Sequence, residues 1–230
     1  MTRKKLLKML EEGENLNIEF KQRFSTFEKI AKEMIAFANT SGGYIIFGID
    51  DNGSVYGVES EKGEAELIKE SALKYCEPPI DYKIDFIELE NKEVVVAEIF
   101  ESVHKPHRVQ DYLNDIDIRT AQVYIRIGEK SVLASKEMIK ILQTNTSKTK
   151  LKNYNVGKNE KIVFEYLDNN ETISVKELSK KANISPRRAS RTLINLVRAN
   201  LLLIHTKDNG EDFFTYAVNR FKTQDKRLKN

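Results

Sequence analysis

Cysteine is almost absent from this 230-residue chain, in which Cys76 is the only one. A single thiol excludes an internal disulfide and any zinc site built from several cysteines. Long apolar runs are also missing, because no segment approaches the roughly 20 residues that a membrane-spanning helix needs. The basic stretch over residues 1–15 has apolar residues at helical spacing and no cleavage site, which indicates an amphipathic helix and not a signal peptide. We therefore expect a cytoplasmic protein without a membrane partner.

The signatures of several enzyme classes are missing as well. The chain has three histidines, and the spacing of His104 and His107 around a proline is poor for metal ligands on a helix. No G-x-x-x-x-G-K-[ST] run occurs, so Gly42 and Gly43 indicate a tight helix-to-strand turn and not a nucleotide phosphate loop. There is no serine or cysteine nucleophile motif. The chemistry therefore rests on carboxylates, lysines and arginines.

The charged residues, 32% of the chain, are divided unevenly along it. Residues 1–143 hold 20 Lys and Arg against 26 Asp and Glu, a net −6, whereas residues 144–230 hold 18 against 9, a net +9. We interpret this asymmetry as two domains, the second of which is suited to contact a polyanion.

Periodicity predicts an α+β fold with a mixed or mostly antiparallel sheet for residues 1–143. Residues 27–40 place Ile30, Met34, Ile35 and Phe37 on one side of a helix that packs on the sheet. Residues 42–58 read as a strand, a tight turn and a second strand. The other predicted elements are helices over 63–76 and 135–143, a hairpin over 80–89 and 92–101, and a strand over 121–128.

The second half of the chain has a different organisation. Residues 144–158 are polar and hold four lysines without an acid, which indicates a linker. We predict a winged helix-turn-helix domain over residues 159–219, made of three helices and a β-hairpin, followed by a basic tail over 220–230. Its third helix starts with Ser185, a good N-cap residue, and Pro186, which suits the first helical position.

That third helix has an apolar face and a basic face. Ala189, Leu193, Leu196 and Val197 should pack inward. The side chains expected to face outward are Arg187, Arg188, Ser190, Arg191, Asn195 and Arg198. Such a helix lies in the major groove of DNA, where arginine pairs with guanine and asparagine with adenine. We expect DNA as the partner, with Lys207 of the wing on phosphate, although a solvated face of a protein-interaction domain has the same pattern.

Two carboxylates stand out in the stretch GENLNIEFK, residues 13–21. Glu14 and Glu19 lie five positions apart, and Lys21 shares a strand face with Glu19. If Asp50 or Asp51 lies near this face, three carboxylates converge as Mg²⁺ or Mn²⁺ prefers. The ion would activate water against a phosphodiester, with Lys21 stabilising the transition state. Exposed strand acids and a turn aspartate explain the same spacing, and both interpretations stay open.

Four stretches of the first domain, taken in order, resemble the Schlafen AlbA_2 family, also called divergent AAA-4 or Alba-like. They are ENLNIEFK, IAFANTSGGYIIFGIDDNGSVYGV, KPHRV and VYIRIGEKSVLAS, within residues 5–143. The resemblance implies a nucleic-acid-binding α+β core that commonly forms a homodimer. Bacterial and archaeal members are often joined to a C-terminal winged helix and described as transcriptional regulators.

In the vertebrate Schlafen branch the same core is a metal-dependent endoribonuclease that acts on structured RNA such as tRNA or rRNA. The resemblance carries its acidic triad onto Glu14, Glu19 and either Asp50 or Asp51, whereas its zinc site has no counterpart here. Basic residues spread over the family motifs are the candidates for further nucleic-acid contact, namely Lys21, Arg23, Lys105, Arg108, Arg126 and Lys130.

Three functions follow from these observations. The first is a cytoplasmic, homodimeric, DNA-binding transcriptional regulator, to which no cofactor is assigned. The second is an Mg²⁺- or Mn²⁺-dependent endoribonuclease with Glu14, Glu19, Lys21 and one of the two aspartates at its active site. The third is a protein-interaction adaptor.

Overall fold

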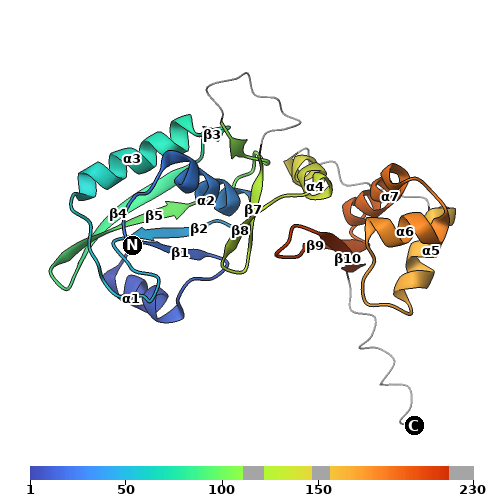
Figure 1. The fold of residues 1–230 in the computed structure, drawn as a ribbon, viewed down its shortest axis with the longest axis horizontal. Coiled ribbons are helices and arrows are strands. Elements are labelled where there is room, and N and C mark those ends of the chain that lie inside the picture. The colour runs from blue at the N-terminus through green and yellow to red at the C-terminus, as the bar shows by residue number, and fades with distance from the viewer. Residues whose placement is uncertain (111–121, 147–155, 218–230) are drawn as a thin grey trace, which may run out of the picture. The chain divides into compact units, whose positions relative to one another are not determined.

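The structure is a computed structural model that describes residues 1–110, 122–146 and 156–217 (Figure 1). The chain divides into two compact units, Met1–Ala134 and Ser135–Asn230. Most of the expected linker and all of the expected basic tail lie outside the described residues. No helix in the described ranges combines the length and the apolar character needed to cross a bilayer.

The first unit is built on a four-stranded sheet with the strand order β1-β2-β5-β4. Strands β1 and β2 are parallel, whereas β5 runs antiparallel to both β2 and β4. The pairs β3–β6 and β7–β8 form two small antiparallel ladders. The elements are α1 (Arg3–Glu12), β1 (Ile18–Lys21), α2 (Phe27–Asn39), β2 (Gly43–Phe47), α3 (Glu61–Lys74), β3 (Cys76–Glu77), β4 (Tyr82–Leu89), β5 (Lys92–Ile99), β6 (Arg108–Val109), β7 (Tyr124–Ile127) and β8 (Lys130–Leu133). The expected α+β fold with a mixed sheet is confirmed.

Helices cover both faces of this sheet (Figure 1). One core cluster joins α2 and α3 to β2 and β5, and a second joins α1 to the opposite face. Ile30, Met34, Ile35 and Phe37 of α2 are fully buried, as the helical period predicts. Each such side chain contributes about 1.5–3 kcal/mol to stability, so the period of α2 determines how the helix is oriented on the sheet.

The two expected hairpins have different outcomes. Strands β4 and β5 form one, with Glu90 and Asn91 at positive φ in its turn. After β2 the chain also makes a tight turn, in which the Gly53 N–H donates to the Asp50 carbonyl at 2.8 Å. The returning segment forms only an isolated bridge between Ile49 and Val55, so the second strand expected there was wrong. The physical reason is that β1 and β5 already occupy both edges of β2.

The second unit contains four helices and one antiparallel hairpin among its described residues. They are α4 (Lys136–Thr146), α5 (Lys158–Leu167), α6 (Val175–Ala182), α7 (Pro186–Arg198), β9 (Leu202–Thr206) and β10 (Asp212–Tyr216). Leu178, Leu193 and Phe214 lie fully buried in a core shared by α5, α6, α7 and the hairpin. An isolated bridge from Ile173 to Phe214 joins the segment before α6 to β10.

Helix α4 belongs to this second unit, whereas the sequence placed it in the first domain. It packs on α7, and its Ile141 and Leu142 are buried. The Glu137 carboxylate accepts a hydrogen bond from the Ser190 hydroxyl of α7 at 2.6 Å. The unit boundary therefore falls after Ala134 and not after residue 143. Helical spacing predicts that α4 has an apolar face, but it carries no information about which surface covers it.

Candidate functional site

Two groups of residues in the structure bear on function: the carboxylates around β1 and the basic face of α7.

The loop before β1 is held in place by hydrogen bonds from asparagine residues. The Asn17 N–H donates to the Asn15 side chain at 2.9 Å, and the Asn17 amide donates to the Gly42 carbonyl at 2.8 Å. This loop turns Glu14 back so that its Oε1 accepts the Phe20 N–H at 2.8 Å. The Glu14 side chain therefore hydrogen-bonds to the backbone of β1 and is half-buried there.

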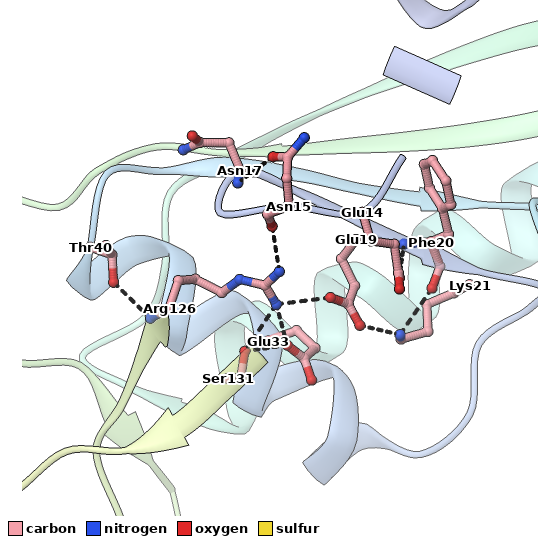
Figure 2. A network of polar contacts seen from close by, with 10 residues as sticks. All are labelled: Glu14, Asn15, Asn17, Glu19, Phe20, Lys21, Glu33, Thr40, Arg126 and Ser131. Carbon is pink, nitrogen blue, oxygen red and sulfur yellow. Dashed lines mark hydrogen bonds and ion pairs between the residues drawn. The ribbon is translucent and has the colours of Figure 1, made fainter. Parts of the chain in front are cut away.

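Glu19 lies within β1 and is 8% exposed. Both of its carboxylate oxygens are paired with cations (Figure 2). Oε2 accepts a hydrogen bond from the Arg126 guanidinium at 2.8 Å, and Oε1 accepts one from the Lys21 ammonium. Lys21 also donates to the Phe20 carbonyl at 2.9 Å. The carboxylate that sequence reasoning placed in a metal site is thus already neutralised by the chain itself.

Arg126 reaches this cluster from β7, and its side chain is fully buried. One guanidinium nitrogen bonds Glu19 and, at 3.2 Å, Glu33 of α2. The other donates to the Asn15 carbonyl at 2.7 Å, and the guanidinium carbon lies 4.6 Å from the centroid of the Phe37 ring. Buried charges persist in proteins when they are paired and hydrogen-bonded in this way. Arg126 was expected on a nucleic-acid-binding surface, and the structure places it inside the first unit instead.

Glu33 and Ser131 belong to this cluster although sequence reasoning did not single them out. The Ser131 hydroxyl donates to the Glu33 carboxylate, and it lies 3.3 Å from the Arg126 guanidinium. Glu33 is one of several acids on α2 and β1, and its pattern in the sequence does not differ from that of an exposed helix residue. Only the packing of β7 and β8 against α2 reveals its role.

The environment of Glu14 raises the pKa of its carboxyl group above the ordinary value. The main cause is burial, and the negative charges of Glu19 and Asp51 add to it, whereas the Phe20 N–H and the Lys21 charge act in the opposite direction. Glu14, Glu19 and Asp51 therefore share one electrostatic environment.

The two candidate aspartates are used in the turn after β2. The Asp50 carboxylate accepts hydrogen bonds from the Gln22 amide and, at 3.5 Å, from the Ser54 hydroxyl. Asp51 is exposed. Within the described ranges, no three His, Cys, Asp or Glu side chains are grouped so that they could hold a metal ion. Because Glu19 is paired with two cations and Asp50 with Gln22, the expected ligand set does not fit Mg²⁺ or Mn²⁺ in this arrangement.

Arg23 is exposed, and the three remaining basic candidates of the first unit differ in exposure. Lys105 is largely buried, and its ammonium donates to the Thr40 carbonyl at 2.8 Å and to Glu101 at 2.7 Å. Arg108 in β6 is half-buried, and Lys130 at the start of β8 is exposed. Lys105 is therefore occupied by internal contacts, and of these three only Lys130 is exposed.

Helix α7 begins as its sequence predicts. The Ser185 hydroxyl accepts the Arg188 N–H at 3.3 Å, and Pro186 is the first helical residue. Ala189, Leu193 and Leu196 are fully buried against the core of the second unit. The side chains of Arg187, Arg188 and Arg191 are exposed on the other face, and Asn195 and Arg198 are half-buried. Helical period alone gives this division because one stripe of α7 is apolar.

Ser190 is the exception on this face. It is 4% exposed, and its hydroxyl points at Glu137 of α4, so it does not lie on the outward surface expected for it. This contact could not be predicted from the sequence, because α4 was expected to belong to the other domain.

A groove of about 930 Å³ runs beside the exposed face of α7. Its walls come from the start of α5, the α6–α7 turn and α7 itself, and include Lys158, Arg187, Arg188, Arg191 and Asn195. Glu160 also lines it, and this carboxylate accepts the Gly157 N–H at 3.0 Å. The groove therefore presents several cations to a ligand.

The β9–β10 hairpin carries Lys207 at its turn. The backbone N–H of Lys207 donates to the Glu211 carbonyl at 2.9 Å, and its exposed ammonium lies 5.9 Å from the centroid of the Phe213 ring. Its side chain is exposed at the hairpin turn.

Comparison with known proteins shows which family the first unit resembles. Residues 14–135 match the family described as Schlafen, AlbA_2, which is 122 of the 230 residues. An uncharacterized ATP-binding protein of Ureaplasma parvum serovar 3 is 37% identical over 91 residues, which cover 37% of this chain and 26% of that protein. The chain thus spans about a quarter of the length of this relative.

Two solved structures have similar regions. A protein from Corynebacterium diphtheriae is 16% identical with a TM-score of 0.41, over 59% of this chain and 27% of its own. The N-terminal domain of an ATP-dependent DNA helicase RecG-related protein from Nitrosomonas europaea is 23% identical with a TM-score of 0.41. The similar region covers 55% of this chain and 88% of that domain. The family match extends from Glu14 through the buried cluster to Ser135, two residues beyond the end of β8. On that match, the chain belongs to the Schlafen AlbA_2 family.

Proposed function

We propose that this chain is a nucleic-acid-binding protein whose second unit binds duplex DNA, and that it acts as a transcriptional regulator. The observation that carries the proposal is the row of exposed arginines in the first half of α7, Arg187, Arg188 and Arg191. Arginines at the start of a recognition helix are placed to meet phosphates and base edges in the major groove.

The element order of the second unit supports this proposal. Three helices, α5 to α7, are followed by the β9–β10 hairpin, which is the arrangement of a winged helix-turn-helix. In that arrangement α7 is the recognition helix and the hairpin is the wing, with Lys207 at its tip. The excess of 18 Lys and Arg over 9 Asp and Glu in residues 144–230 favours a polyanion as partner.

The endoribonuclease hypothesis receives less support from the geometry. Its central acid, Glu19, has both oxygens paired with Arg126 and Lys21, and a metal ion would have to compete with these contacts. We assign Glu19 and Lys21 to the ion-pair cluster of the first unit, and Glu14 to the hydrogen bond that holds the loop before β1. Cleavage of tRNA that requires Mn²⁺ and is lost in Glu19→Gln would support the nuclease instead.

The role of the first unit in this proposal is to contribute to assembly. A homodimer would present two copies of α7 to two half-sites one helical turn apart, which is how helix-turn-helix dimers gain affinity. The Ureaplasma relative is described as ATP-binding, but this chain carries no G-x-x-x-x-G-K-[ST] run, so ATP is not part of the proposal.

The test is the affinity of the full chain for a labelled mixed-sequence duplex, measured by fluorescence anisotropy at several salt concentrations. We expect Arg188→Ala and Arg191→Ala each to weaken binding, by about 1–3 kcal/mol for a base contact, or to lower the salt slope by about 1 for a phosphate contact. Alanine favours a helix, so neither change should unfold α7.

The matched control is Lys181→Ala, which removes one positive charge from the same unit. Lys181 lies on α6 with its ammonium 5.8 Å from the centroid of the Tyr166 ring, and it is not among the residues that line the groove beside α7. Absence of duplex binding at physiological salt, or equal affinities for all variants and the wild type, would contradict the proposal.

A further inference from the structure

A second groove, of about 480 Å³, lies between α4 and α7. Four cations line it: Lys140 of α4 and Arg187, Arg191 and Arg198 of α7. The other described residues of its wall are polar or apolar, and none of them carries a carboxylate. A concave surface with this concentration of positive charge and hydrogen-bond donors is suited to bind phosphate groups.

The position of α4 beside this groove is determined by contacts along its length. The Ser135 hydroxyl accepts the Met138 N–H at 2.9 Å at the start of the helix, and it donates to Asp212 of β10. Two residues further, Glu137 accepts the Ser190 hydroxyl, and Ile141 and Leu142 are buried. Lys140 is thereby placed on the same helix, exposed, and directed to the groove.

Arg198, one of the residues that line the groove, adds an independent observation. Its Nε is buried and has no hydrogen-bond acceptor among the described residues. A buried donor without an acceptor costs about 1–3 kcal/mol, so native structures rarely retain one unless a ligand or water supplies the acceptor. A phosphate oxygen in the groove would supply one.

The two grooves share a wall. Arg187, Arg191 and Asn195 line both the groove beside α5 and the groove beside α4, because they follow one another along α7 at intervals of four residues. A nucleic acid that lies along the exposed face of α7 therefore meets cations on both sides of the helix.

We infer that the α4–α7 groove is a phosphate-binding site that holds a backbone phosphate of the nucleic acid bound by α7, with Lys140 and Arg198 as its ligands. The inference rests on the proposed DNA-binding function and extends it to a helix that sequence reasoning placed in another domain. Phosphate is the shared chemistry, and a free phosphate-bearing anion is the other possible source of it.

The experiment compares Lys140→Ala with Lys136→Ala by anisotropy on the mixed-sequence duplex. Both lysines are exposed on α4, and each substitution removes one positive charge from the same helix, but Lys136 does not line the groove. We expect Lys140→Ala to weaken binding several-fold and to lower the salt slope by about 1, and Lys136→Ala to do neither. Lys140→Arg should retain the wild-type affinity.

The possible results separate this inference from the proposed function. One outcome is that Lys140→Ala and Lys136→Ala bind the duplex equally well while Arg188→Ala binds it more weakly. That result would contradict the phosphate site in the α4–α7 groove and would still support the proposed DNA-binding function. If the wild-type chain binds no duplex, the proposed function fails. A titration with inorganic phosphate, followed by NMR, then tests whether the α4–α7 groove binds phosphate. Saturable shifts of α4 and α7 signals that Lys140→Ala abolishes would support a free anion as the ligand, and their absence would overturn the site.

Discussion

The guanidinium of Arg126 joins three segments that lie far apart in the sequence. It bonds Glu19 of β1, Glu33 of α2 and the carbonyl of Asn15, while its own backbone N–H donates to the Thr40 hydroxyl at 2.9 Å. A buried ion pair of this kind does not necessarily stabilise a fold more than apolar residues would, but removing one partner leaves the other charge buried and unpaired.

Replacement of Arg126 by methionine should therefore destabilise the first unit by about 3–5 kcal/mol, because Glu19 and Glu33 lose their common partner. A urea titration followed by amide NMR spectra, which resolve the first unit, measures this. Lys21→Met is the matched control, since Lys21 pairs with the same carboxylate but its side chain is 27% exposed. A loss in Arg126→Met no larger than that in Lys21→Met would show that the buried pairing is not what holds this cluster together.

The raised pKa of Glu14 gives the first unit a defined dependence on pH. At pH values below its usual pKa of 4.5 the group is protonated in both states, and its contribution to stability is fully present. As the pH rises, the unfolded chain loses this proton first, so stability falls until the native Glu14 has also ionised. Ionised Glu14 is disfavoured by burial and by the charges of Glu19 and Asp51.

Glu14→Gln should remove this dependence while its amide oxygen still accepts the Phe20 N–H. The measurement is the urea midpoint of wild type and variant from pH 4 to pH 7. We expect the stability of the variant, relative to wild type, to increase with pH over the range in which native Glu14 ionises. A constant difference across this range would mean that the pKa of Glu14 is not raised in the folded chain.

At single residues, the sequence predicts exposure well where one periodic element decides it. Arg187, Arg188 and Arg191 are exposed because the opposite stripe of α7 is apolar. Arg126 was misplaced because strand alternation shows which side of β7 it occupies but not that α2 covers that side. Long-range packing of this kind leaves no mark in the local pattern.

At the scale of elements, the contact between α4 and α7 has the clearest consequences. Ser190→Ala would remove the hydrogen bond to Glu137 and leave a half-buried carboxylate without that donor. Because hydrogen bonds to charged groups contribute about 1.5–3 kcal/mol, we expect the opening free energy of α4 to fall by a similar amount. Native-state hydrogen exchange of the α4 amides measures it, with the α5 amides as internal reference. Unchanged protection of α4 would show that apolar burial alone holds this helix.

Most elements could be predicted from the sequence, because the helices have apolar stripes and the β4–β5 turn carries Asn91 at positive φ. Two assignments failed for one reason. The strand expected after the Asp50–Gly53 turn is absent because β2 already has two partners, and α4 joined the other unit because its apolar face fits α7. Both depend on which surfaces meet, and periodicity does not report that.

For the whole molecule, the difference in net charge between the two parts is larger when the chain is divided at the structural boundary after Ala134. Residues 1–134 hold 18 Lys and Arg against 25 Asp and Glu, a net −7, and residues 135–230 hold 20 against 10, a net +10. Affinity for nucleic acid depends on cations that replace condensed counterions, so the second unit is the one suited to bind it. Several cations of the first unit, Arg126 and Lys21 among them, pair with acids of the same unit.

The most direct test of this account is an NMR titration of the isotope-labelled full chain with duplex DNA, in which the amide signals of both units and the arginine side-chain signals are followed. We predict that the shifts concentrate on α7, including the Nε–H signals of Arg187, Arg188 and Arg191, and that the signals of β1 and Arg126 stay unchanged. Shifts confined to β1 and its carboxylates, or no shifts at saturating duplex, would contradict the assignment of nucleic-acid binding to the second unit.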